Sequence, residues 1–302
     1  MKAARASCVV LGLATAGLVA APASAQGPLR VVSDRAVRGF IHVESVAYDP
    51  REKVLYASEF GTHKLDPTLK DGNGRIVKLG LDGKVLEAKF LPGAGGSPLH
   101  KPKGIWIKGS RLWVTDIDSV WVFDLKSRKG QRVSLPGARF ANDTAVLGNA
   151  LYVSDNAADR LFRVEPADFL NVKAEPRVTV VLADEKVHPN GLYPAGGAAL
   201  LVAGFTPNKA NPLYTFSRGR VSALTDPLGR VDGLYRLADG SVLGTDWSSG
   251  SLFQWTKKGG MQKLASGFKG PADFCIIPGK AGYTAVVPDL VQGTLRLVEL
   301  AR

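Results

Sequence analysis

The chain has 302 residues, of which 45% are hydrophobic and 22% charged. This is an ordinary globular composition, and it excludes intrinsic disorder as a description of the whole chain. Lysine and arginine number 39 against 27 acidic residues, which gives a formal net charge of +12. No recognised nucleic-acid motif accompanies the basic runs at 101–111 and 126–132, so we favour a solvated positive surface suited to anionic ligands and expect no nucleic-acid partner.

The N-terminus has the pattern of a cleavable signal peptide. Lys2 and Arg5 precede an apolar run over residues 8–20, and Ala23-Ser24-Ala25 offers the small residues that a signal peptidase accepts. The alternative, a membrane anchor, requires about 20 apolar residues, and this run is shorter. We therefore expect cleavage after Ala25, a periplasmic or secreted protein, and no membrane span.

Removal of this segment would leave Cys275 as the sole cysteine. An exported chain with one cysteine has no intramolecular disulfide, so its stability must come from a packed core and from any bound metal. Cys275 lies between apolar residues and belongs to no cysteine motif, which favours a buried small apolar side chain over a nucleophile. We expect the mature protein to be a monomer.

Internal repetition determines the predicted fold. Short apolar strands that mostly end in an acidic residue recur six times, most clearly at Leu55–Glu59, Leu112–Asp116 and Leu151–Asp155. A further short strand precedes and another follows each copy, with a spacing of roughly 40 to 57 residues, and no segment has the apolar periodicity of a helix. We predict an all-β, six-bladed β-propeller that forms one domain over residues 26–302, with Leu29–Ser33 as the outer strand of the last blade.

Polar residues recur where the innermost strand of each predicted blade begins. Aligning the six copies places the following residues at that position: Glu44, Lys103, Asn142, Asn190, Asp232 and Ala272, with Asp273 one residue later. The starts of the inner strands of a propeller converge on one mouth of the central channel. Two carboxylates and two carboxamides would meet there, and such hard oxygen ligands suit Ca²⁺, with Zn²⁺, Mn²⁺ or Mg²⁺ as alternatives.

A simpler interpretation exists for some of these residues. Asn190-Gly191 and Asp232-Gly233 are ordinary turn dipeptides, and singly they are more often turn formers than ligands. The shared repeat position favours the metal site, because all four oxygen-bearing residues occupy it.

These motifs resemble the family of senescence marker protein, gluconolactonase and luciferin-regenerating enzyme. The resemblance is carried by Glu44 ahead of Tyr48-Asp49-Pro50, and by the segments 139–143, 189–192 and 231–234. It implies a six-bladed propeller and a catalytic divalent metal held by Glu44, Asn142, Asn190 and Asp232.

The hypothesis from these residues is a metal-dependent hydrolase of lactones or related esters, acting on a small and possibly anionic substrate. Asp232 would be the general base, and Lys103 would stabilise the oxyanion or bind a substrate carboxylate, although its charge could also repel the metal. Arg139 and Asp273 are candidate substrate-binding residues. Arg139 precedes Asn142 by three positions, whereas the family's substrate-binding arginine precedes its asparagine by two.

Three questions stay open at this point. A non-catalytic periplasmic propeller that binds a ligand or protein partner would use the same mouth, and a phosphotriesterase-like enzyme would use the same residues. His42 and His188 lie two residues before Glu44 and Asn190 and could be proton shuttles or structural residues. We expect the loops from Gly61 to Asn73 and from Lys89 to His100 to roof the mouth.

Overall fold

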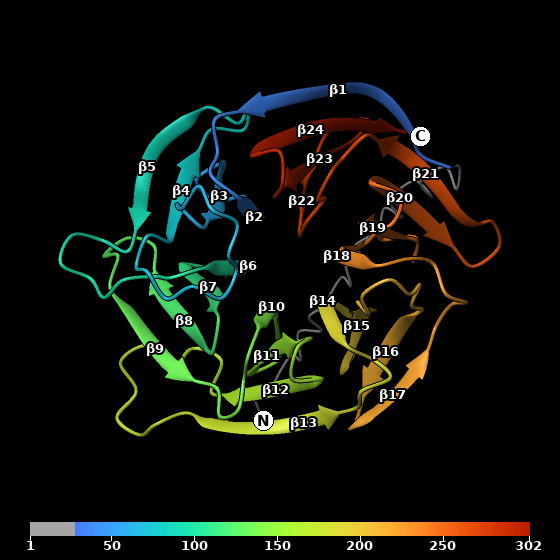
Figure 1. Cartoon of the computed structure of the whole chain (residues 1–302). Coiled ribbons are helices and arrows are strands. Elements are labelled where there is room, and N and C mark those ends of the chain that lie inside the picture. Colours follow the sequence, from blue (N-terminus) through green and yellow to red (C-terminus); the bar gives the residue numbers. More distant parts are fainter. Residues whose placement is uncertain (1–27) are drawn as a thin grey trace, which may run out of the picture.

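The structure, a computed structural model, describes residues 28–302, and in this part of the chain all regular structure is β-strand. The predicted signal peptide and its cleavage site after Ala25 lie outside the described residues. Six antiparallel sheets of four strands stand around a common axis, as Figure 1 shows. The prediction of a six-bladed β-propeller is confirmed.

The strands take equivalent places in the six blades. The innermost strands are β2 (Val43–Asp49), β6 (Pro102–Lys108), β10 (Ala141–Leu147), β14 (Pro189–Gly196), β18 (Val231–Arg236) and β22 (Cys275–Pro278). The second strands are β3 (Val54–Glu59), β7 (Arg111–Asp116), β11 (Ala150–Asp155), β15 (Ala199–Gly204), β19 (Val242–Asp246) and β23 (Gly282–Asp289). The third strands are β4 (Arg75–Leu79), β8 (Ser119–Asp124), β12 (Arg160–Glu165), β16 (Leu213–Ser217), β20 (Ser251–Thr256) and β24 (Thr294–Ala301). The outer strands are β5 (Val85–Leu91), β9 (Gly130–Ser134), β13 (Arg177–Ala183), β17 (Arg220–Ala223), β21 (Gly260–Ser266) and β1 (Arg30–Arg38).

The ring is closed by the N-terminal strand. β1 pairs antiparallel with β24 from Arg30 opposite Ala301 to Arg38 opposite Thr294, so the last blade combines both ends of the described chain. The predicted outer strand at Leu29–Ser33 is therefore confirmed, and it continues to Arg38. The completed last blade packs against the first, since β2 contacts β22 and β23, and closure leaves no long exposed inner edge.

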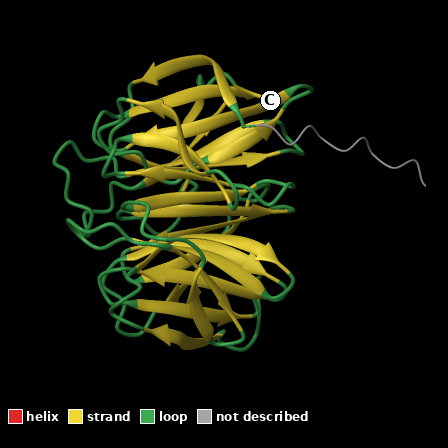
Figure 2. Cartoon of the chain, turned by 90° about the vertical axis from the view of Figure 1, so that its right-hand side faces the viewer, coloured by secondary structure: helices red, strands yellow, loops and turns green. Residues whose placement is uncertain are grey.

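The hydrophobic core lies between neighbouring blades. One cluster, for example, joins Tyr56 and Phe90 of the first blade to Leu112 and Trp121 of the second. Each sheet packs both faces against its neighbours, which explains why strands such as β2 and β3 are buried on both faces. Figure 2 shows the blades stacked edge-on, with the longer loops gathered at one face of the disc. No helix among the described residues has the length and apolar character needed to cross a membrane.

Cys275 is a free, buried thiol, as predicted. Burial raises the pKa of this thiol well above its usual value, which disfavours the thiolate that a nucleophile needs.

Candidate functional site

The innermost strands begin irregularly, and this irregularity places the candidate residues. The pairing of β14 with β15 skips from Pro189 to Leu192, and the pairing of β18 with β19 skips from Val231 to Leu234; β2, β6 and β10 have comparable shifts. Such bulges bend a strand and redirect its side chains. The second residues of these five strands are Glu44, Lys103, Asn142, Asn190 and Asp232. The shared repeat position inferred from the sequence is thus a shared structural position.

Hydroxyl side chains on the second strands stabilise these bulges. The backbone N–H of Ser45 donates to Ser58 Oγ at 2.9 Å, that of Asp143 to Ser154 Oγ at 3.0 Å, and that of Gly233 to Thr245 Oγ1 at 2.8 Å. A bulge removes these N–H groups from the ladder, so the hydroxyl satisfies a donor that would otherwise be buried without a partner. The hydroxyl residue directly before the terminal acid of a second strand therefore has a structural role.

Replacing one such hydroxyl should destabilise the protein. In Thr245→Val, the buried Gly233 N–H loses its acceptor and the Ala272 carbonyl loses the donor that now lies 3.0 Å away. We expect the free energy of unfolding to fall by about 1–3 kcal/mol, measured by urea denaturation. Thr284→Val is the control, since the half-buried Thr284 in β23 makes no side-chain hydrogen bond and should change stability by less than about 0.5 kcal/mol. Equal losses in the two variants would contradict this role.

The acidic residues that end the second strands hold the segments that enter the inner strands. Asp116 accepts the backbone N–H groups of His100 and Lys101 at 2.8 and 2.7 Å. Asp155 accepts those of Arg139 and Phe140 at 2.6 and 2.9 Å. Asp246 and Asp289 make equivalent bonds in later blades. The acid that made the repeat visible in the sequence is therefore an anchor for the mouth, not a ligand in it.

The glycines that follow candidate residues allow close approach of adjacent inner strands. A Cβ on Gly191 would lie 1.8 Å from the backbone oxygen of Asp232, and one on Gly233 would lie 2.8 Å from the Cα of Asp273. Both glycines lie inside β14 and β18 rather than in turns, and neither has a positive φ. The turn-dipeptide interpretation of Asn190-Gly191 and Asp232-Gly233 is therefore wrong, because strand packing at the narrow axis requires these glycines.

The proposed ligand residues are all buried. Glu44, Asn142, Asn190 and Asp232 have exposed fractions between 1% and 6%. Glu44 Oε2 and Asn190 Oδ1 have no hydrogen-bond partner, and buried oxygens of this kind normally have one. Within residues 28–302, no three His, Cys, Asp or Glu side chains are grouped to hold a metal. A cation here would therefore need the carboxamide oxygens as well as the two carboxylates, and the two unpartnered oxygens fit that requirement.

The carboxylates of the mouth affect one another electrostatically. Burial, with Asp273 nearby, raises the pKa of Asp232 to about 7, although a hydrogen bond from Trp247 Nε1 to Asp232 Oδ2 at 2.8 Å opposes the rise. Burial also raises the pKa of Glu44, and the charges of Asp232 and Asp273 add to the effect. A bound cation would reverse these shifts, because it favours the ionised carboxylates.

Lys103 is a buried cation at the ligand position. Its side chain is fully buried, and Nζ donates to the backbone oxygen of Lys101 at 3.2 Å. Nζ also lies 4.4 Å from the centre of the Phe140 ring and 5.7 Å from that of Phe60. Burial lowers the pKa of this ammonium to about 8, while the charge of Glu44 opposes the shift. An ammonium ion has three donors, so Lys103 keeps hydrogen-bonding capacity for a further acceptor.

An aromatic residue that sequence reasoning missed contacts the proposed base. Trp247 directly follows the terminal acid of β19, and its indole donates to Asp232. It also packs edge-on against Phe205 with ring centres 6.0 Å apart, and against a buried cluster that includes Phe60 and Leu290. Phe60, Phe205, Trp247 and Leu290 each come directly after a second strand. These residues could have been identified from the sequence, because each directly follows the last residue of a second strand.

The two predicted substrate-binding residues lie in different surroundings. Arg139 is exposed, and its guanidinium hydrogen-bonds to the carbonyl of Ala157. Asp273 is buried one position further along its inner segment than the ligand position, and it accepts a hydrogen bond from Ser45 Oγ at 2.6 Å. Arg139 is therefore held at the surface, whereas the charge of Asp273 acts on both Glu44 and Asp232.

The two histidines have structural partners. His42 has one ring nitrogen 2.9 Å from the carbonyl of Leu290 and the other 3.0 Å from that of His63. His188 lies 2.5 Å from the carboxylate of Asp159. Both nitrogens of His42 are thus occupied by backbone oxygens, which favours the structural alternative for this residue over a proton shuttle.

The predicted loop over residues 61–73 is tied to the mouth. Fully buried Lys101 bonds both carboxylate oxygens of Asp71 at 2.7 Å and Thr62 Oγ1 at 3.0 Å. The second predicted loop is shorter than expected, because Lys89 to Leu91 belong to β5. Its last residue also contacts the first loop, since the backbone N–H of Gly72 donates to His100 Nδ1 at 3.0 Å.

Comparison with known proteins identifies the same fold in several enzymes. No family model and no curated protein matches the sequence. A gluconolactonase from Xanthomonas campestris is 15% identical with a TM-score of 0.64, covering 90% of this chain and 91% of its own. A structural-genomics target provisionally assigned as a gluconolactonase is 16% identical with a TM-score of 0.65, covering 90% and 94%. Virginiamycin B lyase from Staphylococcus aureus is 12% identical with a TM-score of 0.61, covering 89% and 99%. At these identities the likeness establishes the propeller fold, while the family resemblance of the motifs stays a prediction.

Proposed function

We propose that this chain is a metal-dependent hydrolase of lactones or related esters. The observation that carries the proposal is the pair of buried, unpartnered oxygens on Glu44 and Asn190, at the same strand position as Asn142 and Asp232. A buried oxygen that lacks a hydrogen-bond donor needs another electropositive partner, and a bound cation would provide it. The gluconolactonases among the similar structures support this choice of chemistry.

The four oxygen-bearing residues would hold the cation, with Ca²⁺ as the first choice for a set of hard oxygen ligands. When bound, a divalent cation supplies Lewis-acid polarisation of a carbonyl and lowers the pKa of nearby water. Asp232 would accept the proton of the attacking water at its carboxylate, and the Trp247 indole holds that carboxylate in place. The ammonium of Lys103 would stabilise the developing oxyanion or bind a carboxylate of an anionic substrate.

The walls of the site suit the exclusion of water. Phe60, Leu290 and Ala272 form a buried apolar cluster against Trp247. In such surroundings the Lys103 ammonium interacts more strongly with a developing negative charge than it would in bulk water. The substrate carbonyl would therefore lie near the Lys103 ammonium and the Asp232 carboxylate, with little water to compete with either.

Metal analysis with a hydrolysis screen tests the proposal. We expect the purified protein to carry about one divalent cation per chain, and to hydrolyse members of a panel of sugar lactones and aryl esters. A chelator should abolish hydrolysis, readdition of Ca²⁺ should restore it, and Ca²⁺ at a hundredfold excess over its Kd should stabilise the metal-free protein by about 2.7 kcal/mol.

The opposite result would favour the alternative of a non-catalytic propeller that binds a ligand or partner. That result is a purified protein that binds no divalent cation, by mass spectrometry and by thermal stability, and that hydrolyses no member of the panel. Buried carboxylates with no cation would then serve the fold alone.

We also propose that the protein is exported, on the basis of the signal-peptide pattern at residues 1–25. The expected product begins at Gln26, which N-terminal sequencing of protein from the periplasm or medium would reveal. A protein that retains Lys2 and Arg5 would contradict export by this route.

A further inference from the structure

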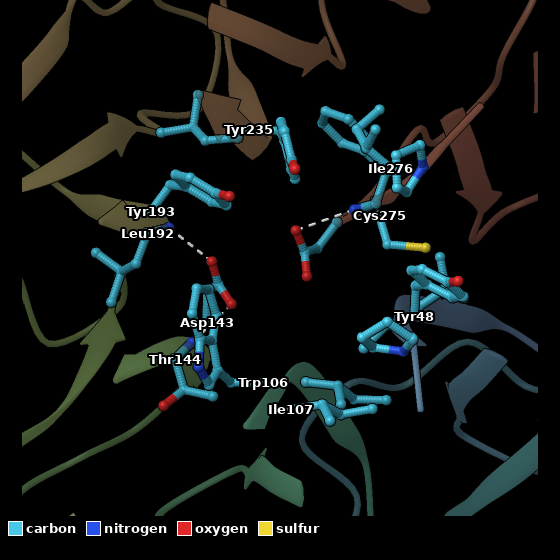
Figure 3. A pocket seen from close by; sticks show the side chains of 18 residues that line it. Tyr48, Trp106, Ile107, Asp143, Thr144, Leu192, Tyr193, Tyr235, Cys275 and Ile276 are labelled. Carbon is cyan, nitrogen blue, oxygen red and sulfur yellow. Dashed lines mark hydrogen bonds between the residues drawn. The ribbon is translucent and has the colours of Figure 1, made fainter. Parts of the chain in front are cut away.

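A cavity lies along the central channel, beyond the start of the inner strands. Its volume is about 370 Å³, and it is lined by the later residues of the inner strands, such as Tyr48, Trp106, Tyr193 and Tyr235. None of the four proposed metal ligands lines it. Figure 3 shows Asp143 among these side chains, which surround one central space. The cavity is therefore distinct from the site at the mouth.

Two buried carboxylates lie at the inner end of this cavity. Asp143 and Asp273 each follow the ligand position by one residue, line the cavity, and are at least nine-tenths buried. The oxygens of Asp143 accept the backbone N–H groups of Thr144 and Leu192, both at 2.6 Å. Those of Asp273 accept the N–H of Phe274 at 3.0 Å and Ser45 Oγ at 2.6 Å. Each oxygen thus has one donor, and a carboxylate oxygen can accept a second.

Aromatic rings form a continuous wall above these carboxylates. Tyr193 lies 4.8 Å from Tyr235 and 5.9 Å from Trp106, measured between ring centres. Tyr48 lines the same cavity from another blade. Tyr48, Tyr193 and Tyr235 are partly exposed, so the cavity is open to solvent at its rim.

Buried acidic side chains outnumber buried lysines along the channel. Four acidic residues, Glu44, Asp143, Asp232 and Asp273, are buried there with Lys103, while the other buried lysine, Lys101, is paired with Asp71 at 2.7 Å. Burial raises the pKa of the Asp143 and Asp273 carboxyl groups, and a cation beside them would favour their ionised forms.

We propose that this cavity binds a small organic monocation of the alkylammonium class. The carboxylates of Asp143 and Asp273 provide the opposite charge, and a cation within about 6 Å of a Tyr or Trp ring gains a further cation–π attraction. An apolar wall with a few convergent polar groups is the usual composition of a small-molecule site. An inorganic cation would have no use for the aromatic wall, which favours an organic ligand.

Calorimetric titration of the full-length protein tests this site without any assay of hydrolysis. The probes are n-butylammonium, tetramethylammonium and the uncharged 1-pentanol. We expect saturable binding of both cations and none of 1-pentanol at the same concentration. We expect Asp273→Asn to weaken binding of n-butylammonium by about tenfold or more, since it removes the buried charge but keeps an acceptor. Tyr235→Leu should weaken binding of tetramethylammonium by about two- to fivefold.

The matched control is Asp226→Asn, which removes an exposed carboxylate outside the channel and should leave the affinity unchanged. Thermal melting checks that each variant is folded. Three results would overturn the proposal: equal binding of 1-pentanol and n-butylammonium, displacement of n-butylammonium by equimolar K⁺ or Ca²⁺, or wild-type affinity in folded Asp273→Asn. A failure of lactone hydrolysis leaves this test unaffected, because it measures binding alone.

Discussion

Asp232→Asn should leave the propeller folded and reduce lactone hydrolysis by about 10² to 10⁴. The substitution keeps the side-chain size and one oxygen that can still accept the Trp247 indole N–H. It removes the charge that lets the group accept a proton from water. Initial rates with a lactone substrate, together with the metal content of the variant, measure the effect.

Glu44→Gln provides the comparison for this result. Glu44 carries an unpartnered buried oxygen and is assigned to cation binding alone, so its substitution should weaken metal affinity while excess Ca²⁺ partly restores the rate. Asp232→Asn should not recover with excess Ca²⁺. If both variants hydrolyse lactones as fast as the wild type, neither residue has the role proposed for it.

The same assignment predicts how hydrolysis depends on pH. In the metal-free protein the pKa of Asp232 is raised to about 7 and that of Lys103 is lowered to about 8. A base must be ionised and an oxyanion stabiliser must be protonated, so the rate should rise with pH as Asp232 ionises and fall as Lys103 loses its proton. A bound cation favours the ionised carboxylate and disfavours the ammonium, so it moves both limbs to lower pH. Loss of the basic limb in Lys103→Met, measured as kcat/KM against pH, would identify Lys103 as its source.

Gly191→Ala should damage both the fold and the site. The added Cβ would lie 1.8 Å from the backbone oxygen of Asp232, so β14 and β18 must separate where Asn190 and Asp232 are held. We expect the free energy of unfolding to fall by at least about 3 kcal/mol, at the upper end for overpacking. We also expect Ca²⁺ affinity to fall at least tenfold. Denaturant titration and calorimetry measure the two effects.

Gly279→Ala is the matched control for this substitution. Gly279 also lacks a positive φ, and the closest atom to its added Cβ would be 3.4 Å away, an ordinary contact. It directly follows Pro278, the last residue of β22, and so lies at the end of that inner strand opposite the mouth. Comparable stability of Gly191→Ala and Gly279→Ala would show that the inner strands can separate without cost, contrary to this account.

The fold could be predicted from the sequence because propeller blades are local structures. Each strand of a blade pairs with the next strand along the chain, so strands such as Leu112–Asp116 and the turns beside them are visible as a repeat. The exception is β1, which pairs with β24 across the length of the described chain. It could still be predicted, because the last blade was the one blade that lacked a fourth strand, and a strand-like segment precedes the first blade.

The common position of Glu44, Lys103, Asn142, Asn190 and Asp232 also followed from the repeat, since equivalent residues of a closed ring face the same axis. The roles of the residues around this position could be seen only in the tertiary structure. Asn190-Gly191 has the composition of a turn, and only the approach of β18 shows that the glycine is required inside a strand. Trp247 was missed because its contact with Asp232 joins the end of one strand to the start of another. The cavity lined by Asp143 and Asp273 likewise depends on the distances between inner strands of different blades at the axis. No single repeat encodes those distances.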